Sequence, residues 1–414
     1  MGERRAQQAA ELGLLDSLHE VDTVGVRSDD AVAAWARSGC MALTGRPDEP
    51  PLGPPSPLVA AVETVSASIE RRAGVAVDGL TLLAERAAVA GLARGGDSSC
   101  GGATRLLPAA DGWVAVTLAR PSDVGDLPAW LATGVDEDEP WTAVARAVRA
   151  RRTHELVERA TLFGLPVAAL ASGAEMRPVP RSSPLPTRVR MDGLLVVDFS
   201  SLWAGPLCTR LLRDAGARVV KVESRSRPDG ARGGPPAFFD LLNAGKEGVA
   251  LDFERDTSYL HDLVRRADVV VEASRPRALA QFGIAAERFL ATEDGPRVWV
   301  SITGYGRADP RVAFGDDGAV GGGLVVEDGA GPCFCADAVA DPLTGLVAAD
   351  ACLAALDAGG RVLLDLPLAG VAAAFAGPTL AVPAGVEAAR PTSSLPTRPG
   401  PALGEHNRKV LAAR

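Results

Sequence analysis

Two aspartates and two cysteines lie within the thirteen residues CFCADAVADPLTG, which span positions 333–345. A carboxylate can attack an activated acyl group if it is ionised, poorly solvated and held in place. Asp341 precedes Pro342, a residue suited to the first position of a helix, and an alanine-rich helical pattern follows. The carboxylate would then lie at the positive end of the helix, which favours the ionised form. The alternative is that Asp341 only caps this helix, as aspartate commonly does.

The cysteines indicate neither a disulfide framework nor a metal site. Six cysteines are too few for a chain of 414 residues stabilised by disulfides. Only Cys333 and Cys335 are close in sequence, and a lone C-x-C lacks the second ligand pair of a zinc site. None of the four histidines has a histidine or cysteine at metal-ligand spacing. We therefore expect reduced thiols and no metal.

Composition narrows the choice of partners and location. The net charge of -9 argues against nucleic acid and against anionic membranes as partners. No apolar run reaches the roughly 18 residues that a membrane span needs. The first twenty residues mix acids into their apolar positions and lack the apolar core of a signal peptide. These features predict a cytoplasmic protein.

The second half of the chain alternates apolar, strand-like runs with helical patterns. Such alternation predicts an α/β fold with a Rossmann-like parallel sheet covered by helices, and ligands of such sheets bind beyond the carboxyl ends of the strands. A G-x-G-x-x-G fingerprint is missing, and bulky Trp203 follows the first strand, so an NAD-dependent dehydrogenase is disfavoured. Strands are expected at 193–200, 217–224, 247–253, 268–274 and 297–304, with helices at 204–216 and 257–267.

The first half is less regular and is punctuated by proline. A proline-rich stretch at 45–57 indicates a loop, and another at 176–188 indicates an extended linker. Strand patterns at 111–119 and 165–172, among helical segments, predict a smaller α+β domain. A third proline-rich stretch, at 390–409, indicates a loosely ordered tail.

Four motifs follow one another in the second half: LLVVDFSSLWAGPLCTRLLRDAGARVVKVESRSRPDGAR, NAGKEGVALDF, ADVVVEASRPRALAQFGI and VWVSITGYGR. In this order they closely resemble the class III CoA-transferases of the CaiB/BaiF type. This group includes formyl-CoA transferase, carnitine CoA-transferase and 2-methylacyl-CoA racemase. The resemblance implies a half that holds CoA, an acyl-CoA and a carboxylic acid as substrates, and no permanently bound cofactor. It also implies a homodimer; the dimers of the family are interlocked, and the sequence leaves open whether this one is.

The first half resembles the portion that follows the Rossmann-like half in this family, so the segment order is rearranged. Residues 38–52 look like the family's linker, and 151–175 look like the return from its small domain. A fused double copy of the fold, trimmed at both ends, would explain this order. The resemblance divides the chain into a linker and small domain (1–185), a CoA-binding domain (186–310), a catalytic segment with helices (311–380) and the tail (381–414).

The resemblance also selects one nucleophile. Transferases of the family use an aspartate with a glycine four residues later, at the start of a helix. Asp341 with Gly345 has this spacing, whereas Asp337 does not and is expected to be a loop charge. The resemblance thus implies an aspartyl mixed anhydride and an enzyme–CoA thioester at Asp341.

Further positions correspond to CoA-binding segments of the family. The loop after the first strand would lie beside pantetheine and adenine, a basic residue after the second strand would contact phosphate, and the loop after the fourth strand would supply further charge. A glycine-rich loop would cover the site. In order, these residues are Leu202, Trp203 and Ala204; Arg225; Ser274, Arg275 and Arg277; and Gly95, Gly96, Gly101 and Gly102.

Two other functions stay open. The racemase branch needs a histidine–aspartate pair before the catalytic aspartate, but the segment AFGDDGAVGGG offers Asp316 and Asp317 without a histidine. Departures from the family pattern at Ala273 and Gln281 leave room for a CoA-binding paralogue that no longer catalyses. No segment indicates which acyl group or acid is used.

Overall fold

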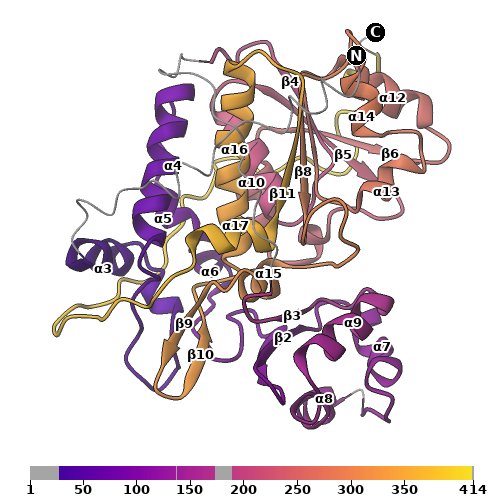
Figure 1. The fold of residues 1–414 in the computed structure, drawn as a ribbon. Helices are drawn as coiled ribbons and strands as arrows, with labels where there is room; N and C mark the ends of the chain where they lie inside the picture. The colour runs from indigo at the N-terminus through magenta and orange to yellow at the C-terminus, as the bar shows by residue number, and fades with distance from the viewer. Residues whose placement is uncertain (1–27, 137, 173–188, 413–414) are drawn as a thin grey trace.

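A parallel sheet of six strands forms the centre of the computed structural model, which describes residues 28–136, 138–172 and 189–412 (Figure 1). The strands lie in the order β11-β8-β7-β4-β5-β6, so the chain order reverses between β4 and β7. This is the strand order of a Rossmann fold, which confirms the predicted class. The strands are β4 (Leu195–Asp198), β5 (Arg218–Ser224), β6 (Glu247–Leu251), β7 (Val269–Glu272), β8 (Val298–Thr303) and β11 (Val362–Pro367).

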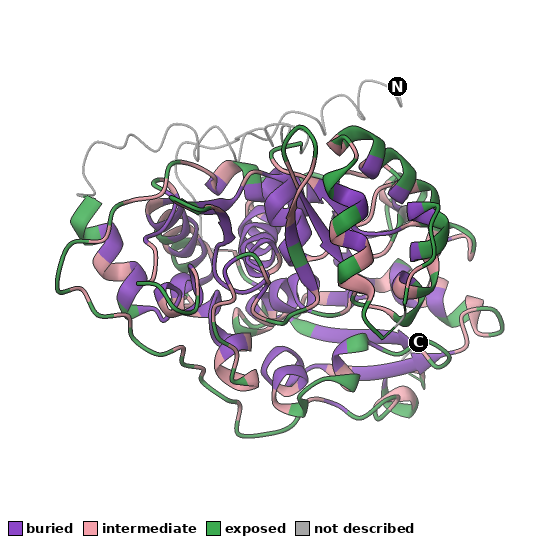
Figure 2. Ribbon diagram, turned by 90° about the horizontal axis from the view of Figure 1, so that it is seen from below, coloured by how far each residue is buried: buried purple, intermediate pink, exposed green. Residues whose placement is uncertain are grey.

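Alternate residues of each strand point to opposite faces of the sheet, and hydrophobic clusters bury both faces. Val196 of β4 belongs to one hydrophobic cluster and Val197 to the other. The first cluster includes α10 (Ala204–Asp214), α16 (Ala340–Asp357) and α17 (Leu368–Phe375). The second includes α12 (Thr257–Arg266), α13 (Pro276–Ala280) and α14 (Ala286–Leu290). Figure 2 shows this layered interior as buried ribbon inside an exposed rim. The continuous apolar runs of the sequence therefore mark strands buried on both faces.

Helix α16 lies at the centre of the first cluster and is almost wholly buried. It packs against α10 on one side and against α4 (Leu58–Ala73) of the first half on another. Gly345 permits the contact with α10, because a Cβ there would lie 2.8 Å from the Ala204 carbonyl oxygen and 2.9 Å from Leu207 Cβ. Its alanine-rich sequence thus reflects close helix packing on several sides.

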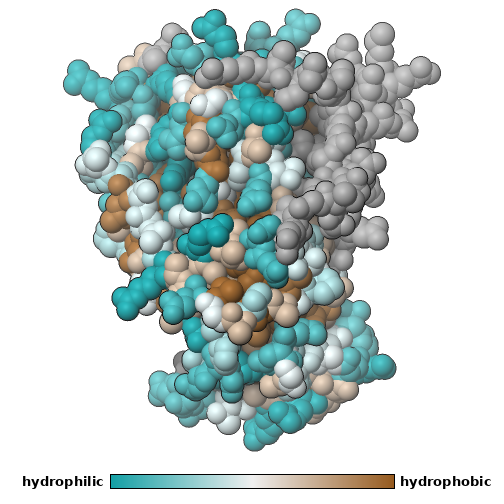
Figure 3. Space-filling model, turned by 90° about the vertical axis from the view of Figure 1, so that its left-hand side faces the viewer, coloured by the Kyte–Doolittle hydropathy of each residue, from teal (hydrophilic) through white to brown (hydrophobic). Residues whose placement is uncertain are grey.

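The first half completes this core and also forms a separate lobe. Helices α3 (Ser28–Arg37) and α5 (Gly79–Leu82) contact α4, η1 (Met41–Leu43) contacts α3, and α6 (Glu85–Ala90) contacts α11. The lower lobe in Figure 1 pairs three antiparallel strands, β1 (Thr104–Pro108), β2 (Trp113–Thr117) and β3 (Val167–Ala169), with three helices. These helices are α7 (Pro121–Leu131), α8 (Pro140–Arg149) and α9 (Thr153–Phe163). Figure 3 shows that this lobe is mostly hydrophilic on the face it presents, whereas apolar residues gather above it.

Smaller elements connect these parts. Helix α15 (Gly315–Gly321) and the antiparallel hairpin β9 (Val325–Asp328) and β10 (Gly331–Phe334) lie between β8 and α16 in the chain. The turn η2 (Gly230–Gly233) and helix α11 (Pro236–Asn243) lie between β5 and β6. The linker predicted at 176–188 lies outside the described residues. Within the described part, no helix is long and apolar enough to cross a membrane.

The C-terminal segment, expected to be loose, is fastened to the sheet edge. The Asn407 side chain accepts from the Ala250 N–H and donates to the Ala250 carbonyl oxygen, both at 2.9 Å. His406 Nδ1 accepts from the Gly248 N–H at 3.1 Å, and α18 (Asn407–Ala412) follows. Side chains thus satisfy backbone groups of β6 that an open edge strand would leave unpaired.

The packing of α16 on α10 predicts that Gly345→Ala destabilises the protein by about 1–3 kcal/mol, because the added methyl group overlaps backbone and side-chain atoms. Gly125→Ala is the matched control, since Gly125 lies inside helix α7 with no neighbouring atom within 4 Å of its Cβ position. That control is expected to stabilise by about 0.5–1 kcal/mol. Urea unfolding measures both, and equal effects of the two changes would contradict the proposed contact.

Candidate active site

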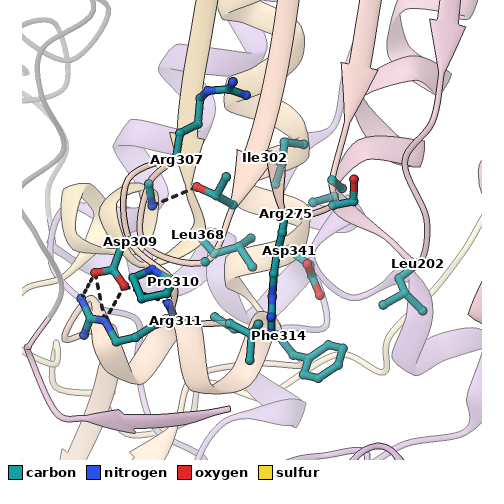
Figure 4. Close-up of a pocket in the computed structure, with 18 of the residues that line it drawn as sticks. Leu202, Arg275, Ile302, Arg307, Asp309, Pro310, Arg311, Phe314, Asp341 and Leu368 are labelled. Atoms are coloured by element: carbon teal, nitrogen blue, oxygen red, sulfur yellow. Dashed lines mark hydrogen bonds and ion pairs between the residues drawn. The ribbon is translucent and has the colours of Figure 1, made fainter. Parts of the chain in front are cut away.

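A cavity of about 470 Å³ opens at the carboxyl ends of β4, β7 and β8 (Figure 4). It lies where the strand order reverses, because β4 and β7 are neighbours whose following helices cover opposite faces of the sheet. Open α/β sheets bind their ligands at this point. The lining comes from the ends of these strands, the loops that follow them and the first residues of α10, α16 and α17. It includes Ser201, Leu202, Ala204, Ala273, Ser274, Arg275, Arg277, Ile302, Thr303, Phe314, Asp341 and Leu368.

Asp341 is the acidic group that α16 brings to this cavity. In Figure 4 it lies in the middle of the lining, between Leu368 and Leu202 in that view. The helix begins at Ala340, so Asp341 is its second residue and Pro342 its third. A proline fits there because the N–H groups of the first turn have no partner within the helix. The helix start was therefore predicted correctly to within two residues.

The carboxylate of Asp341 does not cap its own helix. Val339 occupies the N-cap position, and no side chain forms a capping hydrogen bond there. The Asp341 carboxylate instead accepts a hydrogen bond from the backbone N–H of Gly315. The capping alternative for Asp341 is thus not what the structure contains.

Burial raises the pKa of Asp341 to about 7. The positive charge of Arg86 opposes this rise, while the negative charges of Asp316 and Asp337 add to it. A half-buried carboxylate at the edge of a cavity with this pKa is both poorly solvated and available in its ionised form near neutral pH.

The other aspartates near Asp341 are buried, which corrects the expectation that Asp337 is a loop charge. Asp337 is fully buried, and its two carboxylate oxygens accept from Arg86 Nε at 2.8 Å and Nη2 at 2.5 Å. Asp316 accepts from the Ala338 N–H at 3.0 Å. Asp317 accepts from the Phe314 N–H at 2.9 Å and from Thr117 Oγ1 of the smaller lobe at 3.0 Å. These carboxylates therefore fasten together segments from both halves of the chain.

Burial also raises the pKa values of Asp316 and Asp317, to about 6 and about 7. The negative charge of Asp337 adds to the rise at Asp316, and that of Asp316 adds to the rise at Asp317. Neither residue lines the cavity. Their place behind Asp341 predicts an electrostatic effect on the site without contact with a ligand.

Five of the seven residues that the sequence suggested for CoA line the cavity: Leu202, Ala204, Ser274, Arg275 and Arg277. Trp203 lies behind the wall, where its ring meets Phe238 edge to face with centroids 5.4 Å apart. Arg225 is exposed outside the lining, and its Nε donates to the Ala250 carbonyl oxygen at 3.2 Å.

The glycine-rich loop also lies outside the cavity lining. The Gly96 carbonyl oxygen accepts from the Phe334 N–H at 2.9 Å, and the Gly95 backbone pairs with Ser98. A Cβ at Gly101 would lie 3.4 Å from Arg86 Nη2, whereas a Cβ at Gly102 would have no neighbouring atom within 4 Å. The loop therefore passes beside Arg86 and does not line the cavity.

The arginines of the cavity divide into paired and unpaired ones. Arg307 bonds Glu272 at 2.8 Å and Glu287 at 2.9 Å, and it points away from Asp341 in Figure 4. Arg311 bonds Asp309. Within the described residues, no carboxylate pairs with Arg275 or Arg277. Burial, with the nearby charges of Arg277 and Arg120, lowers the pKa of Arg275. These two arginines are thus placed to receive an anion.

A buried charge network, which sequence reasoning missed, shapes the loop after β4. Lys221 Nζ lies 2.7 Å from Asp229 Oδ2 and donates to the Ser200 carbonyl oxygen at 3.0 Å. Asp229 Oδ1 accepts from the Leu202 N–H at 2.9 Å. Leu202 has φ 69°, a conformation that costs an L-residue about 1–2 kcal/mol. The network holds this strained residue in the cavity wall.

No pattern in the sequence indicates Asp229 or Arg86 as parts of this site. Lys221 interrupts the apolar run of β5, and such a lysine inside a strand is the signal that was available for it. Arg86 follows Glu85 in an ordinary alanine-rich helix and carries no such signal. All six cysteines are free thiols.

The raised pKa of Asp317 predicts that Asp317→Asn increases the free energy of unfolding in a pH-dependent way. Folding favours the protonated carboxyl, so this stabilisation is complete below the unfolded-state pKa of about 4 and is lost as the pH rises through 7. Asparagine cannot ionise, so at pH 8 the variant is expected to be more stable than the parent by on the order of 2 kcal/mol. Urea unfolding at pH 5 and pH 8 measures this, with exposed Asp294→Asn as control. A difference that is the same at both pH values would contradict it.

Two curated proteins and one solved structure are similar to parts of this chain. Acetyl-CoA:oxalate CoA-transferase of Acetobacter aceti is 32% identical over 141 residues, which are 32% of this chain and 36% of that protein. Succinyl-CoA:glutarate CoA-transferase of Mus musculus is 30% identical over 218 residues, or 49% of each chain. The chain thus spans half or less of the length of these relatives. A CaiB/BaiF family protein of Brucella suis is 29% identical, with a TM-score of 0.42, over 45% of this chain and 55% of that one.

The sequence profile described as CoA-transferase family III matches residues 191–407, which is more than half of the chain. This range contains the six-stranded sheet, the cavity at its switch point and Asp341. The chain belongs to CoA-transferase family III.

Proposed function

We propose that the protein transfers CoA between an acyl-CoA thioester and a carboxylic acid, with Asp341 as the nucleophile. The observation that carries this proposal is the carboxylate of Asp341, with a pKa of about 7, in the wall of the switch-point cavity. Membership of CoA-transferase family III supports the reaction class.

In the first half-reaction, a carboxylate oxygen of Asp341 attacks the thioester carbonyl carbon, and the C–S bond breaks to release CoA thiolate. The thiolate then attacks the aspartyl carbonyl carbon of the mixed anhydride, so that the donor acid leaves as a carboxylate. Asp341 now carries CoA as a thioester. The acceptor carboxylate attacks this thioester, CoA thiolate leaves again, and its attack on the acceptor carbonyl gives the new acyl-CoA and restores Asp341. Each step exchanges one leaving group for one nucleophile, as covalent catalysis requires.

The cavity wall offers contacts for both ends of CoA. Leu202, Ala204 and Ile302 supply apolar surface near Asp341, which suits the pantetheine arm. Arg275 and Arg277 offer guanidinium groups without carboxylate partners in the described chain, and guanidinium geometry suits phosphate. We assign the phosphate contact to these two and not to Arg225, because Arg225 lies outside the lining.

Loss of the nucleophile tests the proposal most directly. The protein is incubated with a panel of acyl-CoAs and carboxylic acids, and mass spectrometry then locates the adduct, including a hydroxamate after hydroxylamine treatment. Asp341→Asn is expected to form no adduct and to show exchange only at background, because an amide cannot attack the thioester. Asp350→Asn, on the same helix but outside the cavity, is the matched control and is expected to retain the adduct.

The outcomes of that assay separate the competing functions. Full exchange activity in Asp341→Asn would refute the role of Asp341. Saturable acyl-CoA binding by calorimetry without exchange would favour a CoA-binding paralogue that does not catalyse. Uptake of deuterium at the α-carbon without an acceptor acid would favour a racemase. Light scattering in the same preparation reports whether the protein is the homodimer that the resemblance implies.

The proposal also predicts the pH profile. Only ionised Asp341 attacks the thioester, so kcat/KM is expected to rise with pH and level off above a midpoint near pH 7, the pKa of this carboxyl. An ordinary exposed aspartate would give a midpoint near 4. Stopped-flow or discontinuous exchange assays between pH 5 and 9 measure the profile. A rate that is flat over this range would contradict an aspartate with a raised pKa as nucleophile.

A further inference from the structure

A strained turn immediately precedes the helix that carries Asp341. Ala336 has φ 54° and Ala338 has φ 43°, and both residues are buried on either side of buried Asp337. L-residues avoid this left-handed region, so the surrounding structure must hold such a turn. Strain of this kind is frequently found at functional sites.

Residues of the first half hold this turn. Arg86 donates to both oxygens of Asp337, at 2.8 and 2.5 Å. Thr44 Oγ1 accepts from the Ala336 N–H at 3.1 Å, and Cys100 Sγ lies 3.5 Å from the Ala336 carbonyl oxygen. Three segments of the first half therefore bind two consecutive residues of the turn, Ala336 and Asp337.

The 336–338 turn also fixes the start of α16. The Ala338 carbonyl oxygen accepts from the Asp341 N–H at 3.0 Å. A Cβ at Gly315 would lie 2.3 Å from the same oxygen and 2.7 Å from Asp341 Oδ2, so the Gly315 backbone fits closely against both. A shift of the turn would therefore move Asp341 relative to the cavity and to the Gly315 N–H that bonds its carboxylate.

Arg86 is itself held in place. Its guanidinium lies over the Trp203 ring, 5.4 Å from the ring centroid, and Trp203 is part of the loop after β4. Its neighbour Glu85 forms a separate ion pair with Arg210 of α10, 2.8 Å between Nη1 and Oε2. Helix α6 thus fastens to the Rossmann-like part at two points, of which only Arg86 reaches the turn before Asp341.

We propose that Arg86 is the positioning residue of the nucleophile. Its two hydrogen bonds to the Asp337 carboxylate hold the 336–338 turn so that Asp341 faces the cavity. This inference rests on the proposed role of Asp341. It assigns to the first half of the chain a direct part in an active site whose lining comes from the second half. The positive charge of Arg86 also opposes the rise of the Asp341 pKa, so its loss is expected to shift the pH profile upward.

The experiment compares Arg86→Gln, Arg86→Lys and Asp337→Asn with Glu85→Gln. Glu85→Gln breaks the other buried ion pair of α6 and leaves the turn untouched, so it reports the purely structural cost of loosening this helix. Each variant is assayed for kcat, KM and the pH midpoint with the acyl-CoA that the parent protein uses fastest, and its Tm is recorded.

Arg86→Gln is expected to lower kcat by about 100-fold, the effect of displacing a reacting group by about 1 Å, while KM stays near that of the parent. Its pH midpoint is expected to rise. Arg86→Lys restores the charge without the two-bonded geometry, so it should recover the midpoint but only part of kcat. Arg86→Gln combined with Asp337→Asn should lose no more than the more affected single variant, because both changes break one contact. Glu85→Gln should lower Tm and leave kcat unchanged.

Two results would overturn the inference. One is a kcat and pH midpoint in Arg86→Gln equal to those of the parent, and the other is a loss of kcat in Glu85→Gln as large as that in Arg86→Gln. If the parent protein forms no Asp341 adduct, the proposed function fails, and hydrogen exchange then decides the inference alone. Faster exchange of the 336–341 amides in Arg86→Gln than in Glu85→Gln supports the inference that Arg86 holds the turn, and equal exchange refutes it.

Discussion

The contact between α16 and α10 is the constraint on which the arrangement of this protein depends. Gly345 brings the two helices together beside Ala204, and Ala204 also lines the cavity. Because Asp341 lies one turn before Gly345, the same contact sets the distance between the carboxylate and the loop after β4. The spacing of an aspartate and a glycine four residues apart therefore has a physical reason here. The aspartate faces the cavity, and the glycine brings its helix close enough to do so.

The site combines several features that oppose stability. Asp316, Asp317 and Asp341 are carboxylates whose pKa values burial raises, and Leu202, Ala336 and Ala338 adopt conformations that L-residues avoid. Such costs persist only where the surrounding structure holds them in place. Here the surroundings are the Lys221–Asp229 pair, the Arg86–Asp337 pair and the packed helices. The packing of the rest of the fold thus keeps the Asp341 carboxylate less hydrated than it would be in water.

Much of the sheet was predictable, because its strands are apolar runs between helices with clear endings. The strands expected at 193–200 and 268–274 contain β4 and β7, which face the cavity. Strand β11 was missed, since its run LLDLPLAGVAA continues into α17 without a break in apolar character. The position of Asp341 at the start of a helix was predictable from Pro342 and the alanine-rich pattern after it, whereas the contact of Arg86 with Asp337 was not. Asp337 lies 251 residues away from Arg86, and no local pattern reports such a contact.

Chain order matters less to this site than packing does. The first half contributes α4 to the core around α16, the Thr117 hydroxyl to Asp317, and the Arg86 guanidinium to Asp337. None of these contacts depends on which segment comes first, since a side chain reaches its partner equally well from either direction along the chain. A sheet-bearing half and a half without that sheet thus share one hydrophobic core. The Arg86–Asp337 pair is a contact between the halves whose two charges both act on the Asp341 carboxyl.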